Sequence, residues 1–292
     1  RAVPVRGSAV PAPGFLGPAT RLACSLPGMG ARLAIVGCGR MGSALIGGLL
    51  TSGWAAAHEL LAVDADTGAL ERAAQRFPGL ATAGSPGPAA GAVLAVKPQD
   101  AEAACRQLAA ASVPRVLSVV AGVRTRSLEA WLGGGTRVVR AMPNTPALVG
   151  AGASALAAGS RSDEDDLAWA ESVLGSVGLV VRVPEDQLDA VTALSGSGPA
   201  YVFLVVEALI EAGVRNGLSP QTARQLSYAT LSGAARMLSE SDAPASELRQ
   251  AVTSPGGTTE AALRVLADRR FAQALIEAVG AAAARSRELG SA

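Results

Sequence analysis

Eight residues near the carboxyl end of the chain combine a tight backbone turn with side-chain hydroxyls. Val252 to Thr259 read Val-Thr-Ser-Pro-Gly-Gly-Thr-Thr and precede a helical run that starts at Glu260. The proline and the two glycines, Gly256 and Gly257, let the backbone turn sharply and approach a ligand closely. The hydroxyls of Ser254, Thr258 and Thr259 stand at a helix entry, where free backbone N–H groups favour an anion. The loop predicts either a small-carboxylate site or, with no ligand, a helix N-cap after a Pro-Gly turn.

A glycine-rich hexapeptide offers a second site. Residues 37–42, Gly-Cys-Gly-Arg-Met-Gly, follow the apolar run 31–36 and precede a predicted helix over 43–52. In this strand, turn and helix context the pattern predicts dinucleotide binding. Gly37 is expected to make the turn, Gly39 to let a pyrophosphate approach, and Gly42 to let helix and strand pack closely. The predicted contacts are Gly37, Cys38, Gly39, Arg40, Met41 and Gly42.

Other candidate cofactor residues follow predicted strands, because ligands of such folds bind outside the carboxyl ends of parallel strands. Asp64 and Ala65 follow the strand 60–63, and an acidic residue there favours NADH over NADPH. After the next predicted strand come Val96, Lys97 and Pro98, and Lys97 is the only lysine of the chain. The small-residue turn Ala121-Gly122, at the end of a predicted strand over 115–123, and the residue Asn144 complete the set. For Asn144, between two prolines, a stiffened loop without a cofactor contact is an equal alternative.

Composition excludes several classes of protein. The 292 residues are 49% hydrophobic with a formal net charge of +1, so neither nucleic acid nor a charged membrane surface is an expected partner. No uninterrupted apolar run reaches the roughly 18 residues of a membrane span. Cys24, Cys38 and Cys105 form no metal-ligand pattern and no paired framework, so we expect no metal and a cytoplasmic protein. Cys38 is expected to fill space rather than to act as a redox centre.

The chain divides into three parts by pattern. Residues 1–30 are rich in Pro and Gly without any period, and we expect a disordered leader there. Residues 31–183 are expected to form a dinucleotide-binding domain of the Rossmann type with a mixed sheet. Residues 184–292 are expected to be all-helical, with helices near 185–194, 199–216, 219–239, 244–252, 259–268 and 271–289. The fold class is therefore α/β followed by an all-α domain.

Five motifs in one order resemble the pyrroline-5-carboxylate reductase family of proline biosynthesis. They are the glycine hexapeptide 37–42, Ala-Val-Lys-Pro at 95–98, Met-Pro-Asn-Thr-Pro at 142–146, the run Asp-Ala-Val-Thr-Ala-Leu-Ser-Gly-Ser-Gly-Pro-Ala-Tyr at 189–201, and Thr-Ser-Pro-Gly-Gly-Thr-Thr at 253–259. The resemblance runs from about Ala31 to Leu289. The last two motifs are highly specific.

The resemblance implies a reaction and roles for residues. NADH or NADPH would reduce the C5=N bond of L-1-pyrroline-5-carboxylate to yield L-proline. The substrate carboxylate would rest on the loop formed by Ser254, Gly256, Gly257 and Thr258. Thr259 matches the family threonine that hydrogen-bonds the ring nitrogen and is the predicted catalytic residue. Glu185 matches a family glutamate near the substrate amine, and Ser197 lies in the matching glycine-serine break.

The resemblance also implies an assembly, and it has two departures. Helical domains of two subunits would interlock into a homodimer with the active site at their boundary, and such dimers often form a decamer. Ala251 stands where some relatives have Asn, so a substrate contact from that side chain is missing. Asp64 and Ala65 stand where NADPH-preferring relatives often carry small hydroxyl residues.

Four alternatives share part of the pattern. A 3-hydroxyacid dehydrogenase of the 6-phosphogluconate type needs a lysine in the helical domain, and no lysine follows Lys97. A His-dependent hydroxyacid dehydrogenase would have to use His58, which is on the wrong side of the sheet. A coenzyme F420-type NADP reductase shares only the first domain and lacks the Ser-Pro-Gly-Gly loop. A non-catalytic nucleotide-sensing scaffold is the alternative outside the enzymes.

Overall fold

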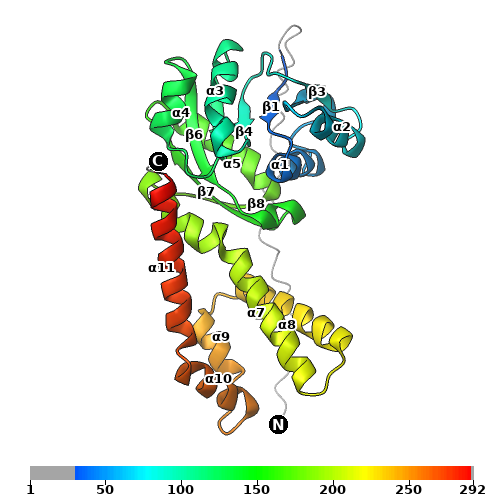
Figure 1. Cartoon of the computed structure of the whole chain (residues 1–292), viewed down its shortest axis with the longest axis vertical. Helices are drawn as coiled ribbons and strands as arrows, with labels where there is room; N and C mark the ends of the chain where they lie inside the picture. Colours follow the sequence, from blue (N-terminus) through cyan, green and yellow to red (C-terminus); the bar gives the residue numbers. More distant parts are fainter. Residues whose placement is uncertain (1–29, 291–292) are drawn as a thin grey trace.

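The computed structural model describes residues 30–290, which form a large sheet flanked by helices and a second set of helices that projects away from it (Figure 1). The leader predicted for residues 1–30 lies, apart from Gly30, outside the described residues, and so does Cys24. The structure is α/β in the sheet-containing part and all-helical after residue 182 among the residues described. It has the Rossmann-like architecture with a helical carboxyl-terminal part that the sequence predicts.

Eight strands form one mixed sheet. They are β1 (Leu33–Val36), β2 (Leu60–Val63), β3 (Ala81–Ala83), β4 (Ala92–Leu94), β5 (Arg115–Ser118), β6 (Arg137–Met142), β7 (Gly152–Ala158) and β8 (Gly178–Arg182), in the order β3-β2-β1-β4-β5-β6-β7-β8. All neighbours are parallel except β6 and β7, so β7 and β8 run against the other six. The carboxyl ends of β1, β2, β4, β5 and β6 therefore meet at one edge, where every predicted cofactor residue lies.

Eleven α-helices connect and extend the sheet within residues 30–290. They are α1 (Arg40–Thr51), α2 (Thr67–Arg76), α3 (Ala101–Ala110), α4 (Thr125–Leu132), α5 (Glu164–Leu174), α6 (Leu188–Val191), α7 (Gly198–Arg215), α8 (Pro220–Glu240), α9 (Ala245–Ala251), α10 (Thr258–Asp268) and α11 (Phe271–Leu289). A π-helical turn at Thr192–Gly196 joins α6 to α7. The predicted helices after residue 184 match these closely, although π geometry interrupts the first.

Three local predictions differ from the structure. The first helix begins at Arg40 rather than at residue 43, because the fingerprint itself supplies its first turn. The run 115–123 is extended only as far as Ser118, and the remainder forms the turn at Ala121 and Gly122. The strand β3 has only three residues, too few for a hydrophobic pattern to reveal it.

The alternation of side chains along β1 builds a core on each face of the sheet. Leu33 and Ile35 pack with α1, α2 and α5, whereas Ala34 and Val36 pack with α3 and α4. Strands buried on both faces are expected in parallel sheets covered by helices. The result is a rigid support for the turns at the carboxyl edge.

The helical part has far less core of its own. Val206 is the only buried residue of α7, and neither α9 nor α10 has one. Phe203 and Leu204 of α7 are 61% and 66% exposed, so the apolar side chains of this helix are not buried within one chain. Apolar faces of this extent mark a surface for another protein or for a membrane. The run Glu185–Arg215 is long and apolar enough to span a membrane by length and composition, which is weak evidence because core helices of soluble proteins pass the same test.

Candidate active site

The glycine turn after β1 has the geometry of a nucleotide-binding loop. Gly37 has φ +102°, and a Cβ there would lie 2.5 Å from the carbonyl oxygen of Ala95. A Cβ on Gly42 would lie only 1.9 Å from the carbonyl oxygen of Gly37. A Cβ on Gly39, in contrast, would meet no atom within 4 Å. The outer glycines are needed for the fold, whereas the space above Gly39 is open to a ligand.

The first turn of α1 is prepared to receive an anion. Gly39 caps this 12-residue helix without a side-chain hydrogen bond, and the first turn contains no acidic residue. Its free N–H groups and the positive end of the helix dipole therefore face the open space above the glycine turn. Arg40 is exposed and Met41 half-buried at this position. A pyrophosphate fits this chemistry.

Asp64 closes the turn from the neighbouring strand. One carboxylate oxygen accepts a hydrogen bond from the Cys38 N–H at 2.7 Å, and the other accepts one from the Asp66 N–H at 2.9 Å. Ala65 is exposed beside it. Asp64 thus places a negative charge where an adenosine ribose would bind, while also holding the glycine turn.

Cys38 is a structural residue by its surroundings. Its side chain is buried, and burial together with the Asp64 carboxylate raises the pKa of the thiol to about 11. Its sulfur lies 3.7 Å from the Val63 carbonyl oxygen. A thiol in this state is protonated at neutral pH and is a poor nucleophile. Among residues 30–290, no group of three or more His, Cys, Asp or Glu side chains is arranged to hold a metal ion.

The other predicted cofactor residues lie along the same edge. Val96 is half-buried after β4, and Lys97 and Pro98 are exposed next to it. Lys97 makes no ion pair with the residues that the structure describes. Because β4 pairs with β1, Lys97 stands one strand away from the glycine turn. Gly122, with φ +76°, turns the chain after β5, next to the exposed Ala121.

Asn144 lies at this edge but its side chain is engaged with the protein. Its amide NH₂ donates to the carbonyl oxygen of Ser195 at 3.1 Å, and its amide oxygen accepts from the Ala153 N–H at 2.9 Å. It is only 9% exposed. The side chain therefore joins the sheet edge to the π-helical turn, and a cofactor contact by Asn144 stays a prediction.

The glycine-serine break around Ser197 borders a cleft that is lined by Ser195 and Gly198, while Ser197 itself is not among the lining residues. The Ser197 N–H donates to the carbonyl oxygen of Thr192 at 2.8 Å, which is the hydrogen bond of a π-helical turn. Such turns are frequent at functional sites. The adjacent cleft of about 480 Å³ lies between this break, the loop after β6 and α11. Its walls are mainly apolar: Asn144, Pro146, Leu194, Ser195, Gly198, Pro199, Tyr201, Val202, Phe203, Leu275 and Val279.

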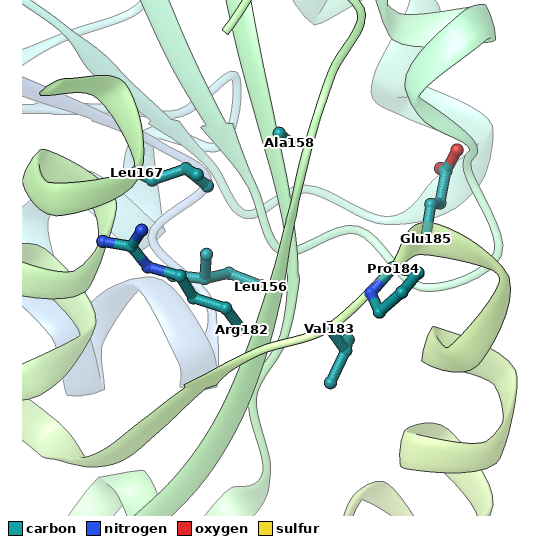
Figure 2. A pocket seen from close by; sticks show the side chains of 7 residues that line it. All are labelled: Leu156, Ala158, Leu167, Arg182, Val183, Pro184 and Glu185. Carbon is teal, nitrogen blue, oxygen red and sulfur yellow. The ribbon is translucent and has the colours of Figure 1, made fainter. Parts of the chain in front are cut away.

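Glu185 is held by three hydrogen bonds at the junction of the two parts. Its carboxylate accepts from the Thr125 N–H and the Thr125 hydroxyl, both at 2.7 Å, and from the Arg140 guanidinium at 3.0 Å. Burial alone raises the pKa of Glu185, but the hydrogen bonds from Thr125 and Arg140 outweigh burial and hold that pKa below its ordinary value. Figure 2 shows this carboxylate turned away from Arg182, across a hollow of about 340 Å³. The carboxylate is ionised at neutral pH and engaged within its own chain.

The hydroxyl-bearing loop connects α9 to α10. Gly256 has φ +71°, and its N–H donates to the Glu260 carboxylate at 2.7 Å. The Gly257 N–H donates to the carbonyl oxygen of Ser254 at 3.0 Å. Thr258 and Thr259 are the first two residues of α10, which Gly257 caps without a side-chain hydrogen bond. The loop binds a carboxylate in this structure, and that carboxylate comes from Glu260.

The loop and the nucleotide edge lie far apart within one chain. Helices α9 and α10 stand at the end of the molecule opposite to the sheet, connected back to it by α11 (Figure 1). Nineteen helical residues give α11 a length of about 28 Å. The structure therefore assembles the predicted cofactor residues at one edge but leaves Ser254, Thr258 and Thr259 away from it.

Sequence reasoning missed three residues of the junction: Thr125, Arg140 and Ser286. Arg140 is a charged residue inside an apolar strand pattern and is nine-tenths buried. A buried arginine requires an acidic partner, so an arginine within this apolar strand pattern could have predicted a buried ion pair. Thr125 and Ser286 carried none, because their partners are 60 and 97 residues away in the sequence.

Comparisons with known proteins agree with both parts of the structure. Residues 185–289 match the family model described as pyrroline-5-carboxylate reductase dimerisation, and residues 32–122 match that of the NADP oxidoreductase coenzyme F420-dependent family. The pyrroline-5-carboxylate reductase of Mycobacterium tuberculosis is 43% identical over 286 residues, covering 89% of this chain and 97% of the relative.

Solved structures agree over the whole fold. A pyrroline-5-carboxylate reductase from Coxiella burnetii superposes with a TM-score of 0.83 at 39% identity, covering 89% of this chain and 98% of that one. The pyrroline carboxylate reductase of Plasmodium falciparum, solved with NADP bound, gives a TM-score of 0.79 at 31% identity, covering 90% and 100%. With the glycine turn at one end and the Ser-Pro-Gly-Gly-Thr-Thr loop at the other, the chain belongs to the pyrroline-5-carboxylate reductase family.

Proposed function

We propose that the protein reduces L-1-pyrroline-5-carboxylate to L-proline, the last step of proline biosynthesis. As a member of its family it is an oxidoreductase that uses a pyridine nucleotide and acts on a small molecule. The observation that carries the proposal is the presence in one chain of an open dinucleotide turn and a carboxylate-binding loop with hydroxyls. When bound, NAD(P)H would supply the hydride that adds to the C5 carbon of the C5=N bond, and the ring nitrogen would take up a proton from water to complete the reduction to proline.

We assign the cofactor to the carboxyl edge of the sheet. The free N–H groups at the start of α1 stabilise the pyrophosphate over Gly39, with Cys38, Arg40 and Met41 beside it. Lys97, between Val96 and Pro98, offers a positive charge to phosphate or ribose oxygens. Ala121 and Gly122 leave room for the nicotinamide ribose, and Asn144 lies next to them.

We assign the substrate to the loop before α10. Backbone N–H groups of Gly256 and Thr258 receive the substrate carboxylate, in competition with Glu260 at Gly256. Gly257, whose N–H is bonded to Ser254, lets the backbone approach the substrate. The Thr259 hydroxyl hydrogen-bonds the ring nitrogen and orients the C5=N bond. Ser254 adds a hydroxyl to the same loop, and Ser197 supplies one from the other side of the cleft. Most of the rate then comes from orientation, since the imine is already electrophilic.

We assign Glu185 to the side of the site that faces the substrate amine. Its side chain starts the helical part and retains lone pairs for a substrate amine. Three hydrogen bonds from its own chain already occupy the carboxylate. Glu185→Gln kinetics measured against the imine decide whether it touches the substrate.

The assembly that fits this division is an interlocked homodimer. Since the loop and the nucleotide edge lie far apart in one chain, a second copy brings its loop to the edge of the first. The exposed apolar faces of α7 and α11 supply the contact surface, and a decamer of such dimers is the larger assembly that the resemblance implies. Light scattering tests this: an active monomer contradicts the dimer, and a stable dimer at high concentration contradicts the decamer.

We place the domain boundary after residue 183, with a leader before residue 31 and the protein in the cytoplasm.

Asp64 and Ala65 at the ribose site favour NADH, because a carboxylate repels a 2′-phosphate. The enzyme should use NADH at least as well as NADPH. A kcat/KM for NADPH tenfold above that for NADH would contradict this preference.

Oxidation of NADH with fresh pyrroline-5-carboxylate tests the reaction, comparing wild type with Thr259→Ala. Loss of one transition-state hydrogen-bond donor lowers kcat by about 10²-fold. Thr51→Ala, an exposed threonine at the end of α1, is the matched control and should retain full activity. Equal rates for Thr259→Ala and wild type would remove Thr259 from the mechanism. Absence of turnover in wild type with either cofactor would favour a nucleotide-sensing scaffold.

A further inference from the structure

Both ends of the helical part meet one short segment of the nucleotide-binding part. This segment, residues 119–125, connects β5 to α4 and contains the turn at Ala121 and Gly122. Glu185, where the helical part begins, bonds to Thr125 at one end of the segment. The last residues of α11 pack on Gly122. The segment that is assigned to the nicotinamide ribose is therefore also the place where the helical part is attached.

The hydrogen bonds at Thr125 form a helix cap supplied from a distant part of the chain. Thr125 is the first residue of α4, and its own N-cap, Arg124, makes no side-chain cap hydrogen bond. Glu185 supplies the missing acceptor with one oxygen on the Thr125 N–H and the other on the hydroxyl. A carboxylate at a helix N-terminus also interacts favourably with the helix dipole.

Arg140 completes this group from the middle of β6. Its guanidinium donates to the Glu185 carboxylate at 3.0 Å, and its side chain is 9% exposed. Hydrogen bonds between charged partners are stronger than neutral ones and are expensive to leave unmade when buried. The three side chains of Thr125, Arg140 and Glu185, hereafter the clasp, thus fix α4, β6 and the start of the helical part together.

The far end of the helical part reaches the same segment. A Cβ built on Gly122 would lie 3.7 Å from the carbonyl oxygen of Leu289, and one built on Gly290 would lie 3.4 Å from that of Gly122. The Ser286 hydroxyl donates to the Asp189 carboxylate at 2.6 Å and holds α11 against α6. The Gly122 side of the turn therefore lies against the end of α11, three residues from the clasp, while Ala121 is exposed.

We propose that Thr125 and Arg140 act through Glu185 as positioning residues, which set the Ala121–Gly122 turn and the nicotinamide end of the cofactor for hydride transfer. Gly122 is only three residues from Thr125. Val123, between them, and Val120, just before the turn, are buried in the core. A displacement at Thr125 is therefore transmitted to the turn. Hydride transfer depends steeply on such placement, since an error of about 1 Å can cost 10²-fold in rate.

The test uses a matched pair of threonine substitutions in the full-length enzyme. Thr125→Val removes the hydroxyl donated to Glu185 while keeping side-chain shape. Thr136→Val is the control, because Thr136 is equally buried and its hydroxyl bonds to the Val113 carbonyl oxygen, inside the nucleotide-binding part. The inference rests on the proposed function, so kcat and KM are measured with pyrroline-5-carboxylate and NADH, together with the cofactor Kd from NADH fluorescence.

The clasp predicts that Thr125→Val lowers kcat/KM for NADH about tenfold, equivalent to ~1.4 kcal/mol. Thr125→Ser, which keeps the hydroxyl, should return it to within about twofold, and Thr136→Val should retain wild-type kcat and KM. In a double-mutant cycle with Glu185→Gln, the second substitution should lower kcat/KM little further than the first, because both break the same contact. A merely structural role would instead lower the melting temperatures of both valine variants and leave kcat per folded enzyme unchanged.

Several results would overturn the proposal. One is a kcat/KM of Thr125→Val equal to that of Thr136→Val, and another is failure of Thr125→Ser to restore it. Additive effects of Thr125→Val and Glu185→Gln, with the imine KM raised only by the latter, would place Glu185 on the substrate. If Thr125→Val does not fold, Glu185→Gln and Arg140→Lys carry the same comparison. If wild type shows no turnover, the proposed function fails, and the clasp is tested by the NADH Kd alone: Thr125→Val should raise it and Thr136→Val should not, so equal Kd values for the two variants refute the clasp.

Discussion

The substitution Gly39→Ala, which adds one methyl group, should weaken cofactor binding without destabilising the fold. Gly39 has φ −67° and ψ −163°, which any L-residue adopts, and its added Cβ would meet no atom within 4 Å. Alanine at a helix N-cap destabilises the folded protein by about 1 kcal/mol. Replacing glycine also lowers the conformational entropy of the unfolded chain, which stabilises the folded protein by about 0.4–1 kcal/mol. The free energy of unfolding should therefore change little, and the melting temperature should stay within about 4 °C.

The same methyl group stands where the pyrophosphate must approach the first turn of α1. Loss of one charge-assisted hydrogen bond to a backbone N–H costs about 1.5 kcal/mol or more, so the Kd for NADH and NADPH should rise at least about tenfold. Fluorescence titration of the bound nicotinamide measures this, alongside thermal unfolding of the same sample.

Two other glycine-to-alanine substitutions serve as comparisons for Gly39→Ala. Gly42→Ala places a Cβ 1.9 Å from a backbone oxygen, and the necessary backbone shift should destabilise the protein by about 3 kcal/mol. Gly175→Ala, exposed with helical angles and no atom within 4 Å, should leave both stability and cofactor affinity near wild type. Unchanged nucleotide Kd in a folded Gly39→Ala protein would refute the placement of the pyrophosphate over this glycine.

Four further predictions follow from single contacts. Asp64→Ser should shift the ratio of kcat/KM values toward NADPH, measured with both cofactors, and an unchanged ratio would exclude Asp64 as the discriminator. Glu260→Gln should lower the KM for pyrroline-5-carboxylate severalfold, since the Gly256 N–H loses a competing carboxylate; an unchanged KM would place the substrate elsewhere. The pKa of Glu185 is depressed in the folded state, so ionised Glu185 contributes its full share to the free energy of unfolding above the ordinary carboxyl pKa of about 4.3, and this contribution is lost as the pH falls below that value. The difference in the free energy of unfolding between wild type and Glu185→Gln, measured by urea unfolding, should therefore disappear at acid pH and not at alkaline pH. Cys38, with its pKa raised to about 11, should resist iodoacetamide at pH 8 in the native protein and react after unfolding, as peptide mass spectrometry can show.

Motifs whose physics is local were predictable from the sequence. The turn at Gly37, the close packing at Gly42 and the helix that starts at Thr258 depend on residues adjacent in the chain, and the structure has all three. Helix bounds after residue 184 followed from apolar spacing and from Gly and Pro punctuation. The strand β3 escaped because its partner β2, rather than its own three residues, makes it a strand.

The roles of several polar side chains were not predictable in the same way. Asn144 was expected to face a cofactor or to lie in a stiff loop, and the structure shows its amide bonded to Ser195 and Ala153. Glu185 was assigned because it matches a family glutamate near the substrate amine, and the structure shows its carboxylate bonded to Thr125 and Arg140. Ser195, Thr125 and Arg140 are 51, 60 and 45 residues away from the side chains that they bond, and a motif does not record such partners.

The sequence by itself determined the family, the order of the two parts and the conformation of the two candidate ligand loops, because each of these follows from short-range backbone constraints and side-chain periodicity. Only the tertiary structure decided how those loops are related. It placed the nucleotide residues along one edge through the parallel pairing of β1, β4 and β5, and it placed Thr259 at the far end of α11. The physical reason is that strand pairing and interhelical packing join residues far apart in the chain, whereas a motif constrains only its neighbours. The buried group of Thr125, Arg140 and Glu185 exists for the same reason, and no one of these residues alone indicates it.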